Sequence, residues 1–293
     1  MTNIAFIGLG HMGHPMVCNL LKAGFKVSVF DVTSSAIQSL VAVGAIGASS
    51  VKEAVKEADV VITMLQTGQQ VKSVCLGETG FFAHVKPNIL YIDSSSIEIT
   101  TTRELHALAE KNKMAMIDAP VSGGVLGAEA ATLTFMVGGT LENFAQGKPI
   151  LEKMGKKIVH AGVAGSGQAA KICNNLILGI SMIAVSEGFA LGKKLGLDPK
   201  KFFDISSNSS GQCWSMTSYC PVPGLVEKAP SNQEFKPGFM AKMMLKDLRL
   251  GQLAAESVGA AIPLGAEAAE LYNLFVNQGN GEMDFSGIIK MFF

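Results

Sequence analysis

Charged residues are scarce in this chain of 293 residues, and neither sign is in excess. Only 16% of the residues are charged, and 24 Lys and Arg balance 24 Asp and Glu to a formal net charge of zero. Binding along a nucleic-acid backbone needs clustered Lys and Arg in excess. We therefore expect no nucleic-acid partner.

Long hydrophobic runs and patterned cysteines are also missing. The longest apolar run, residues 176–185, has about ten residues where a membrane span needs roughly 20, so we expect no membrane partner. The five cysteines are odd in number and show no CxxC spacing, and the histidines show no metal-ligand spacing, so we assign no metal site. No basic region precedes an apolar run at the N-terminus, and we expect a cytoplasmic protein.

Apolar residues and glycine are abundant instead. Hydrophobic residues make up 48% of the chain, with 32 Gly besides, which is enough apolar surface to exclude disorder. Between residues 4 and 160, short β-branched runs alternate with amphipathic stretches, the pattern of a parallel sheet covered by helices on both faces. The predicted strands are 4–7, 27–30, 60–64, 89–92, 114–118, 134–137 and 157–160, with helices such as 12–23 and 50–58 between them.

After Gly167 the pattern becomes helical. Residues 168–195 contain no Pro and repeat apolar residues at helical spacing, which predicts one long helix. The expected fold class is α/β, with an N-terminal Rossmann-type doubly wound sheet followed by an all-helical C-terminal domain. We place the first domain at residues 1–162 and the second at 163–293, joined by the long interdomain helix. Further helices are predicted at 199–208, 238–258 and 266–277, with a loop at 209–237.

A glycine-rich loop, GLGHMG at residues 8–13, follows the first predicted strand and opens the first predicted helix. Gly8 permits the tight turn, Gly10 lets the backbone approach a pyrophosphate, and Gly13 lets the helix pack closely on the strand. The helix N-terminus offers N–H donors and a partial positive charge to the phosphates. We therefore expect a dinucleotide on this loop, bound by Gly8, Leu9, Gly10, His11, Met12 and Gly13.

Asp31 ends the second predicted strand, 18 residues after Gly13, where a carboxylate can accept hydrogen bonds from an adenine ribose. It would also repel a 2′-phosphate, because two charges at about 4 Å interact by roughly 4 kcal/mol at an effective dielectric near 20. No Arg follows within residues 32–35 to accept that phosphate. NAD is the expected cofactor rather than NADP, the alternative being that Asp31 is only a turn residue.

Two segments carry candidate chemistry. The segment DAPVSGG at residues 118–124 ends a predicted strand, and Ser122 with neighbouring backbone N–H groups could cradle a substrate carboxylate, unless it is a plain glycine-rich turn. Lys171 lies near the start of the long helix with Asn175 one turn later on the same face. The helix dipole and apolar neighbours both disfavour the ammonium form, which could lower the pKa of Lys171 into the range where Lys acts as a general acid and base. The alternative is that Lys171 is a surface Lys.

Two further features remain open on the residues alone. Lys246 and Asp247 form a charged pair within an apolar helix, and they are either a site wall or a structural ion pair. The lone tryptophan, Trp214, is either a core residue or a ligand contact.

Four motifs together resemble the β-hydroxyacid dehydrogenase family in order and spacing, over essentially the whole chain. They are GLGHMGHPMVCNL at residues 8–20, DAPVSGG at 118–124, GVAGSGQAAKICNN at 162–175 and KDLRL at 246–250. Within that family, residues 209–224 with Trp214 and Tyr219 resemble the enzymes that oxidise 3-hydroxyisobutyrate to methylmalonate semialdehyde in valine breakdown.

The resemblance implies roles for individual residues. It implies that Lys171 is the catalytic acid and base with Asn175 assisting, and that Ser122, Gly123 and Gly124 hold the substrate carboxylate. It implies that Lys246 closes over the cofactor and substrate, and we expect Trp214 to wall the pocket. NAD contacts are implied along residues 3–31 and at Leu65, Gln66, Gln70 and Ser96, the last three departing from the family's usual Pro, Asn and Thr.

The expected reaction moves a hydride from a small hydroxy acid to nicotinamide C4 while Lys171 takes the hydroxyl proton. Related alternatives are a semialdehyde or glyoxylate reductase of the same family. Alternatives of other classes are a non-catalytic dinucleotide-binding scaffold, against which Lys171 and Asn175 argue, and a methyltransferase, against which the helical second half argues. The apolar composition also predicts a homo-oligomer, a dimer or tetramer.

Overall fold

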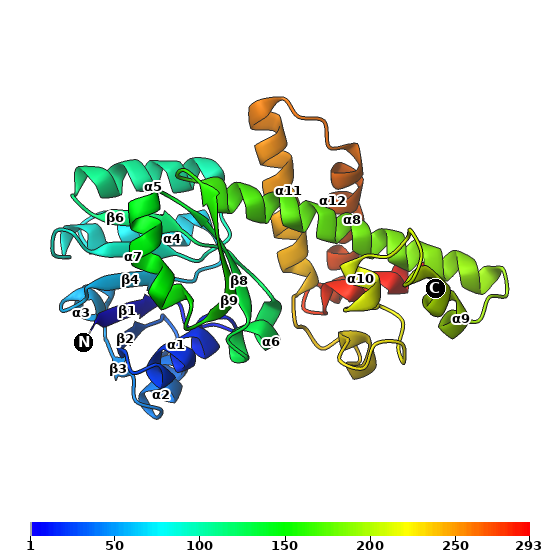
Figure 1. Ribbon diagram of the computed structural model, residues 1–293, viewed down its shortest axis with the longest axis horizontal. Coiled ribbons are helices and arrows are strands. Elements are labelled where there is room, and N and C mark those ends of the chain that lie inside the picture. The colour runs from blue at the N-terminus through cyan, green and yellow to red at the C-terminus, as the bar shows by residue number, and fades with distance from the viewer. Residues whose placement is uncertain (1) are drawn as a thin grey trace. The chain divides into compact units, whose positions relative to one another are not determined.

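The computed structural model describes residues 2–293, and the chain divides into two compact units, Met1–Lys171 and Ile172–Phe293. The point of division falls inside helix α8 (Ser166–Lys194), because Lys171 is the last residue of the first unit. Figure 1 colours the sheet-containing unit from blue to green and the helical unit from green to red.

The first unit is built on one nine-stranded sheet in the order β3-β2-β1-β4-β5-β6-β8-β7, with β9 paired to β8. Pairing is parallel from β3 through β6, whereas β8 runs antiparallel to β6 and β7. The predicted doubly wound α/β sheet is thereby confirmed. The strands are β1 (Asn3–Ile7), β2 (Lys26–Phe30), β3 (Ile46–Gly47), β4 (Val60–Thr63), β5 (Leu90–Asp93), β6 (Ala115–Asp118), β7 (Val121–Ser122), β8 (Leu133–Gly138) and β9 (Gly155–Gly162).

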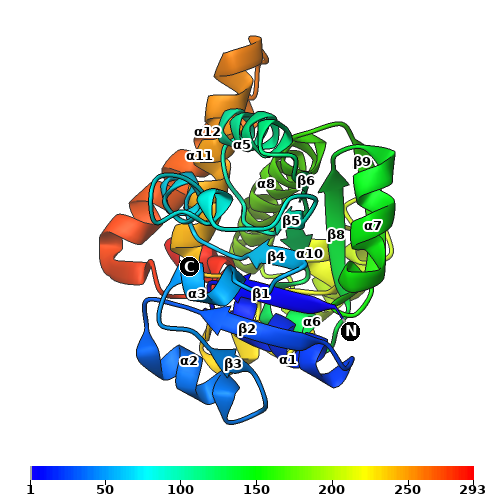
Figure 2. The ribbon, with the colours of Figure 1, turned by 90° about the vertical axis from the view of Figure 1, so that its left-hand side faces the viewer.

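Helices cover both faces of this sheet (Figure 2). Alternate strand residues point to opposite faces, and both sets are apolar, so each face is buried under helices. In β1, Ile4 and Phe6 pack with α1 and α7, whereas Ala5 and Ile7 pack with α3, α4 and α5. The strands are therefore apolar at nearly every position. The helices of this unit are α1 (Gly13–Lys22), α2 (Ser34–Val41), α3 (Val51–Val55), α4 (Gly68–Cys75), α5 (Ile99–Lys111), α6 (Gly124–Glu129) and α7 (Leu141–Leu151).

Local details differ from the sequence expectation where elements are short. Strands β3 and β7 have two residues each, which is too few to show a periodicity. The helix expected at residues 50–58 is the shorter α3. Ser50 caps it by accepting the Glu53 N–H at 3.1 Å. In a capping box the Glu53 carboxylate would accept the Ser50 N–H in return, but here it accepts from the N–H and the hydroxyl of Ser49.

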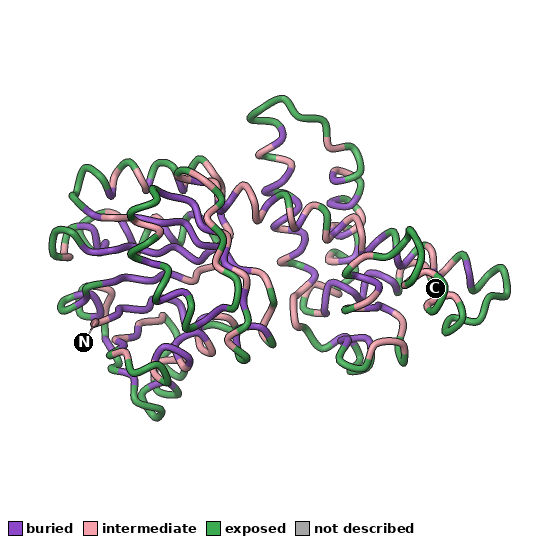
Figure 3. Tube along the Cα trace, viewed as in Figure 1, coloured by how far each residue is buried: buried purple, intermediate pink, exposed green. Residues whose placement is uncertain are grey.

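The second unit is helical, as expected, and an isolated bridge between Met240 and Asp284 is its one piece of β pairing in residues 172–293. Its core packs α8 against α11 and α12, with Met244, Leu248 and Tyr272 fully buried. Figure 3 colours the buried stretches of the chain purple. The segment 209–237, expected to be a loop, contains one short helix and a 3₁₀ turn, Pro230–Gln233. The helices after α8 are α9 (Pro199–Ser206), α10 (Trp214–Thr217), α11 (Ala241–Val258) and α12 (Pro263–Phe275), followed by a π-helical turn (Val276–Asn280) and a 3₁₀ helix (Phe285–Met291).

Helix α8 is long and apolar enough to cross a membrane, with 29 residues and a mean hydropathy of 1.5 over its most apolar stretch. The sequence shows no uninterrupted apolar run of this length, because scattered polar residues interrupt the helix. These few residues lower its mean hydropathy only slightly. Core helices of soluble proteins have the same length and composition, and 44% of this stretch is buried inside the protein. The helix is weak evidence for a membrane, and the expectation of no membrane partner stays a prediction.

Candidate functional site

The carboxyl ends of five neighbouring parallel strands meet at one edge of the sheet. In spatial order β2, β1, β4, β5 and β6 end at Phe30, Ile7, Thr63, Asp93 and Asp118. From β1 the chain proceeds outward through β2 and β3, and it then returns to β4 on the other side of β1. This reversal makes the gap between β1 and β4 the switch point at which open α/β sheets bind ligands.

The glycine loop lies at that switch point, and its three glycines have three different surroundings. Gly8 has φ +97°, and a Cβ there would collide with the Met64 carbonyl at the end of β4. A Cβ on Gly13 would collide with the Gly8 carbonyl, so Gly13 allows α1 to begin flush against β1. A Cβ on Gly10 would meet no heavy atom within 4 Å, so the space above Gly10 is open to a ligand.

Helix α1 offers an uncapped N-terminus to that open space. The N-cap residue, Met12, makes no side-chain cap, and the first turn carries no acidic residue. The positive end of the helix dipole is therefore open to an anion, although within this turn the His14 N–H already donates to the Gly10 carbonyl at 3.0 Å and Pro15 has no N–H. The loop and the helix together fit the pyrophosphate of a dinucleotide.

Asp31 holds the glycine loop. Its two carboxylate oxygens accept the Leu9 N–H at 2.7 Å and the Thr33 N–H at 2.8 Å. A carboxylate oxygen has about two acceptor positions, which leaves capacity for ribose hydroxyls. The sequence did not predict the bond from Asp31 to the loop, and the ribose contact stays a prediction.

The other expected cofactor residues follow the ends of β4 and β5. The Leu65 N–H donates to Ser95 Oγ at 2.9 Å, which ties these two strand ends together. The Gln70 side chain turns back to accept the Gln66 N–H at 3.0 Å. Ser96, which follows Ser95 in the chain, is half-buried. An open groove of about 740 Å³ runs from the loop at Gly10 past Gln66 and along α1 to α6, a volume suited to a small-molecule site.

Beneath this edge lies a chain of buried polar groups that sequence reasoning did not identify. Thr63 Oγ1 donates to Asp93 Oδ1 at 2.8 Å and lies 3.0 Å from the Tyr91 hydroxyl, to which the Cys75 thiol donates at 3.3 Å. Burial raises the pKa of Asp93 to about 6, although hydrogen bonds from Ser95 and Thr63 oppose the shift. Burial also raises the pKa of Tyr91 and of Cys75, so both stay protonated.

The expected carboxylate cradle lies at the junction of β7 and α6. Ser122 ends β7, and Gly123 and Gly124 adopt positive φ of +135° and +61° before the helix continues. A side chain with a Cβ rarely adopts these values, so both glycines are required by the turn itself. Ser122 and Gly124 are half-buried and Gly123 is exposed, which leaves their polar groups accessible to a ligand.

Lys171 and Asn175 lie one turn apart on α8. Lys171, half-buried, ends the first unit, and Asn175 is fully buried within the second. The Asn175 amide is oriented by Asp247 of α11, because its Nδ2 donates to Asp247 Oδ2 at 2.5 Å. The amide nitrogen therefore faces Asp247. The amide oxygen accepts a hydrogen bond from Asn174 Nδ2 at 3.0 Å, and its second acceptor position is the one that can meet a hydroxyl or an ammonium.

Asp247, whose role sequence reasoning left undecided, contacts both Asn175 and Lys246. Its other carboxylate oxygen lies 3.2 Å from Lys246 Nζ, and Asp247 is buried while the Lys246 side chain is 27% exposed. The pair is thus an ion pair that also orients a candidate site residue. The signal for this pair in the sequence was two adjacent charged residues, Lys246 and Asp247, within an apolar helix.

Trp214 is not a core residue, since 49% of it is exposed. Its ring stacks on Tyr219, with ring centres 4.8 Å apart, and Tyr219 stacks in turn on Phe285. The Tyr219 hydroxyl donates to Asp284 at 2.9 Å, and burial raises the Tyr219 pKa, so it stays neutral. The exposed indole therefore presents a rigid apolar surface, as a pocket wall requires.

Two family models match the chain in succession. The NAD binding domain of 6-phosphogluconate dehydrogenase matches residues 3–162. A model described as NAD-binding of NADP-dependent 3-hydroxyisobutyrate dehydrogenase matches residues 165–292. The expectation of NAD as cofactor is confirmed by these matches.

Proteins of similar sequence align over their full length. An NAD-dependent L-serine dehydrogenase of Pseudomonas aeruginosa is 48% identical over 292 residues, 100% of this chain and 98% of that protein. A 3-hydroxyisobutyrate dehydrogenase of the same organism is 47% identical over 295 residues, 100% of this chain and 99% of that protein. The solved structure of Mycobacterium tuberculosis 3-hydroxyisobutyrate dehydrogenase with L-serine has a TM-score of 0.94 at 48% identity, covering 99% of each chain.

Proposed function

The chain belongs to the β-hydroxyacid dehydrogenase family, and we propose that it oxidises 3-hydroxyisobutyrate to methylmalonate semialdehyde with NAD, as in valine breakdown. The observation that supports this most is the placement of Lys171 and Asn175 on one face of α8, with the Asn175 amide oriented by a buried carboxylate. A proton acceptor with an oriented polar neighbour is what alcohol oxidation needs. A dinucleotide-binding scaffold would have no use for that pair.

We propose the following role for each group in the reaction. Bound NAD supplies the hydride acceptor. Lys171, in its neutral form, takes the proton from the substrate hydroxyl as the carbon–oxygen double bond forms, and becomes an ammonium. Asn175 accepts a hydrogen bond through its amide oxygen and keeps Lys171 or the hydroxyl in line. The N–H groups and hydroxyl of residues 122–124 bind the substrate carboxylate and so fix the carbon that reacts.

Two features support the choice of substrate and cofactor. The Trp214 indole offers an apolar surface of the kind that a C2 methyl group prefers, and the stack on Tyr219 holds it in place. Asp31 is held at the glycine loop by the Leu9 N–H, and a carboxylate there would repel the 2′-phosphate of NADP. Residues 1–162 and 163–293 stay our proposed domain limits, and a homo-oligomer stays our proposed assembly.

L-Serine is the second candidate substrate. It is the substrate named for one full-length relative, and it is present in the solved structure of another. L-Serine and 3-hydroxyisobutyrate share a carboxylate and a primary alcohol on the third carbon, so the same proton and hydride transfer applies to both. They differ at C2, where one carries an ammonium and the other a methyl group.

The test is a steady-state comparison of NAD reduction with 3-hydroxyisobutyrate, L-serine, 3-hydroxypropionate, glycerate and 4-hydroxybutyrate. We expect the highest kcat/KM with 3-hydroxyisobutyrate. A higher value with L-serine would select the second candidate. Faster reduction of glyoxylate or succinic semialdehyde with NADPH would refute both candidates and the assignment of Asp31.

Lys171→Ala tests the chemical assignment itself. We expect kcat to fall by roughly three orders of magnitude while the Kd for NAD changes little, because only the proton acceptor is removed. Lys194→Ala provides the matched control, since Lys194 is an exposed Lys in the last turn of the same helix. A kcat near the wild-type value in Lys171→Ala would refute the proposed mechanism.

A further inference from the structure

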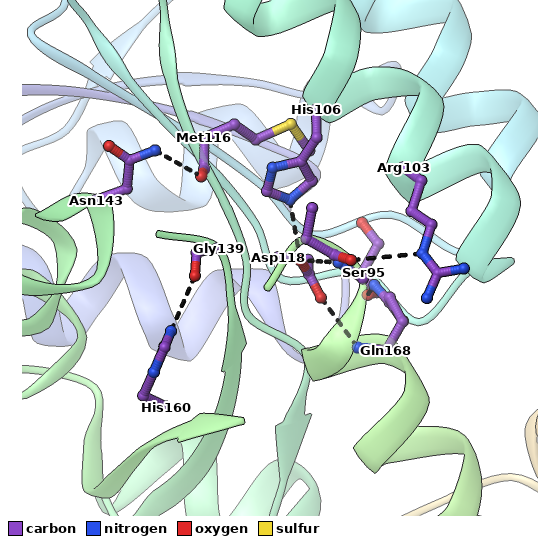
Figure 4. A network of polar contacts seen from close by, with 11 residues as sticks. Ser95, Arg103, His106, Met116, Asp118, Gly139, Asn143, His160 and Gln168 are labelled. Atoms are coloured by element: carbon purple, nitrogen blue, oxygen red, sulfur yellow. Dashed lines mark hydrogen bonds and ion pairs between the residues drawn. The ribbon is translucent and has the colours of Figure 1, made fainter. Parts of the chain in front are cut away.

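Asp118 is a fully buried carboxylate at the end of β6, and nothing in the hydride transfer uses it. Its oxygens accept three hydrogen bonds, all drawn from the first unit. Oδ1 accepts the Gly165 N–H at 2.8 Å and lies 2.9 Å from His106 Nε2, while Oδ2 accepts the Gln168 N–H at 3.0 Å (Figure 4). Since a carboxylate only accepts, His106 carries its proton on Nε2.

Two of these bonds hold the start of α8 from outside the helix. The first N–H groups of a helix have no partner within it, and a residue just before the helix usually satisfies them. Here the acceptor comes from another strand, 47 residues before Gly165 and 50 before Gln168 in the chain. The first turn of α8 is therefore attached directly to the end of β6, and the carboxylate also complements the helix dipole.

The Gln168 side chain makes a second attachment, to the end of β5. Its Nε2 donates to the Ser95 carbonyl at 2.7 Å, and its Oε1 accepts the Ile97 N–H at 3.2 Å. Gln168 is fully buried, so both bonds are shielded from water. Ser95 in turn accepts the Leu65 N–H, which connects α8 to the strand end expected to contact the cofactor.

The packing around this carboxylate leaves no room for the helix to shift toward the strand. A Cβ on Gly167 would lie 2.8 Å from Asp118 Oδ2 and would collide with the Met136 carbonyl. A Cβ on Gly138 would lie 2.5 Å from Asp118 Oδ1. The glycines at both positions permit the close approach that the hydrogen bonds require.

We propose that Asp118 and Gln168 are positioning residues that act through Lys171. Lys171 follows Gln168 by three residues, less than one helical turn, so a first turn held at two points fixes where the Lys171 side chain begins. This inference rests on the proposed role of Lys171.

The first experiment replaces Asp118 in the full-length protein. Asp118→Asn keeps the shape but offers one acceptor oxygen, so Gly165 and Gln168 lose their separate acceptors. We expect kcat to fall roughly 10- to 100-fold, as for a misplaced reactive group, while KM changes less than about threefold. A rise in KM with kcat unchanged would overturn the proposal, because the anchor would then act on substrate binding.

A double-mutant cycle distinguishes positioning from general damage. If Asp118 acts through Lys171, then adding Asp118→Asn to Lys171→Ala lowers the residual turnover by less than about twofold. If Asp118 has only a structural role, the double variant loses the further 10- to 100-fold, and the proposal fails. Should Asp118→Asn not fold, Gln168→Met takes its place in the same cycle, and Gln168→Glu, which keeps the acceptor for Ile97, is expected to restore part of kcat.

Asn143→Ala is the matched control. Asn143 donates to the Met116 carbonyl of the same strand at 3.2 Å but makes no hydrogen bond to α8 among the described residues (Figure 4). We expect it to keep kcat, and an equal loss there would overturn the proposal. The two proposals fail in different ways. If the proposed function is wrong, the single variant Lys171→Ala keeps its turnover. If only this inference is wrong, Lys171→Ala is inactive and Asp118→Asn has normal turnover.

Discussion

Replacing the buried carboxylate of Asp93 by an amide should change how the stability of the first unit depends on pH. Asp93 is fully buried, its Oδ1 accepts bonds from Thr63 and Ser95, and its Oδ2 has no hydrogen-bond partner in residues 2–293. Burial raises its pKa from 3.8 to about 6. The folded protein therefore favours the protonated form more strongly than the unfolded chain does.

The sign and size follow from this difference. Below pH 3.8 the group is protonated in both states and contributes nothing; between 3.8 and about 6 the unfolded chain releases its proton first, so the free energy of unfolding falls as pH rises. Above pH 6 the full effect is present, about 3 kcal/mol at roughly 1.4 kcal/mol per pKa unit. About 2 kcal/mol of this is lost between pH 4.5 and 7.5.

Asp93→Asn resembles the protonated form at every pH and should not show this loss. We expect its Tm, measured relative to wild type by circular dichroism, to rise by roughly 4–8 °C between pH 4.5 and 7.5. Glu110→Gln removes an exposed carboxylate on α5, and its curve of Tm against pH should be parallel to that of the wild type. Parallel curves for Asp93→Asn as well would refute the argument from burial.

Two further predictions concern the cofactor loop. Asp31→Asn should raise the ratio of kcat/KM with NADP to that with NAD by roughly 10- to 100-fold, because the charge facing a 2′-phosphate is removed, and an unchanged ratio would contradict this role. Gly13→Ala should lower both Tm and NAD affinity because its Cβ collides with the Gly8 carbonyl, whereas Gly10→Ala should weaken NAD binding alone. Calorimetric titration and thermal melts check both, and a wild-type Tm for Gly13→Ala would count against the packing argument.

The sequence predicted the strands and long helices because their signals are local. The strand at residues 4–7 is observed as Asn3–Ile7, and the helix at 168–195 as Ser166–Lys194. A strand buried on both faces is a short apolar run, and a long helix repeats its apolar residues, so both patterns are visible in one segment. The glycine loop was equally visible, since each glycine answers a steric need at a fixed spacing.

The sequence did not show which polar groups meet when the strands align. Asp118 was predicted only as the end of a strand, yet it caps a helix that begins 48 residues later, with His106 as a third partner. Asp247 was undecided until the fold placed it against Asn175. These contacts join residues distant in the chain, and one sequence without relatives carries no record of such pairs.

The sequence by itself therefore determined the architecture, the dinucleotide loop and the identity of the candidate proton acceptor. The first two depend on residue types at short, fixed separations, and the third on the order and spacing of four motifs along the chain. Only the tertiary structure decided how these parts are held: Asp31 bonds the glycine loop, Asp118 and Gln168 hold the first turn of α8, and Asp93 is buried with bonds from Thr63 and Ser95 on one carboxylate oxygen. The physical reason is that a hydrogen bond depends on atoms within about 3 Å, a distance that only the folded chain sets.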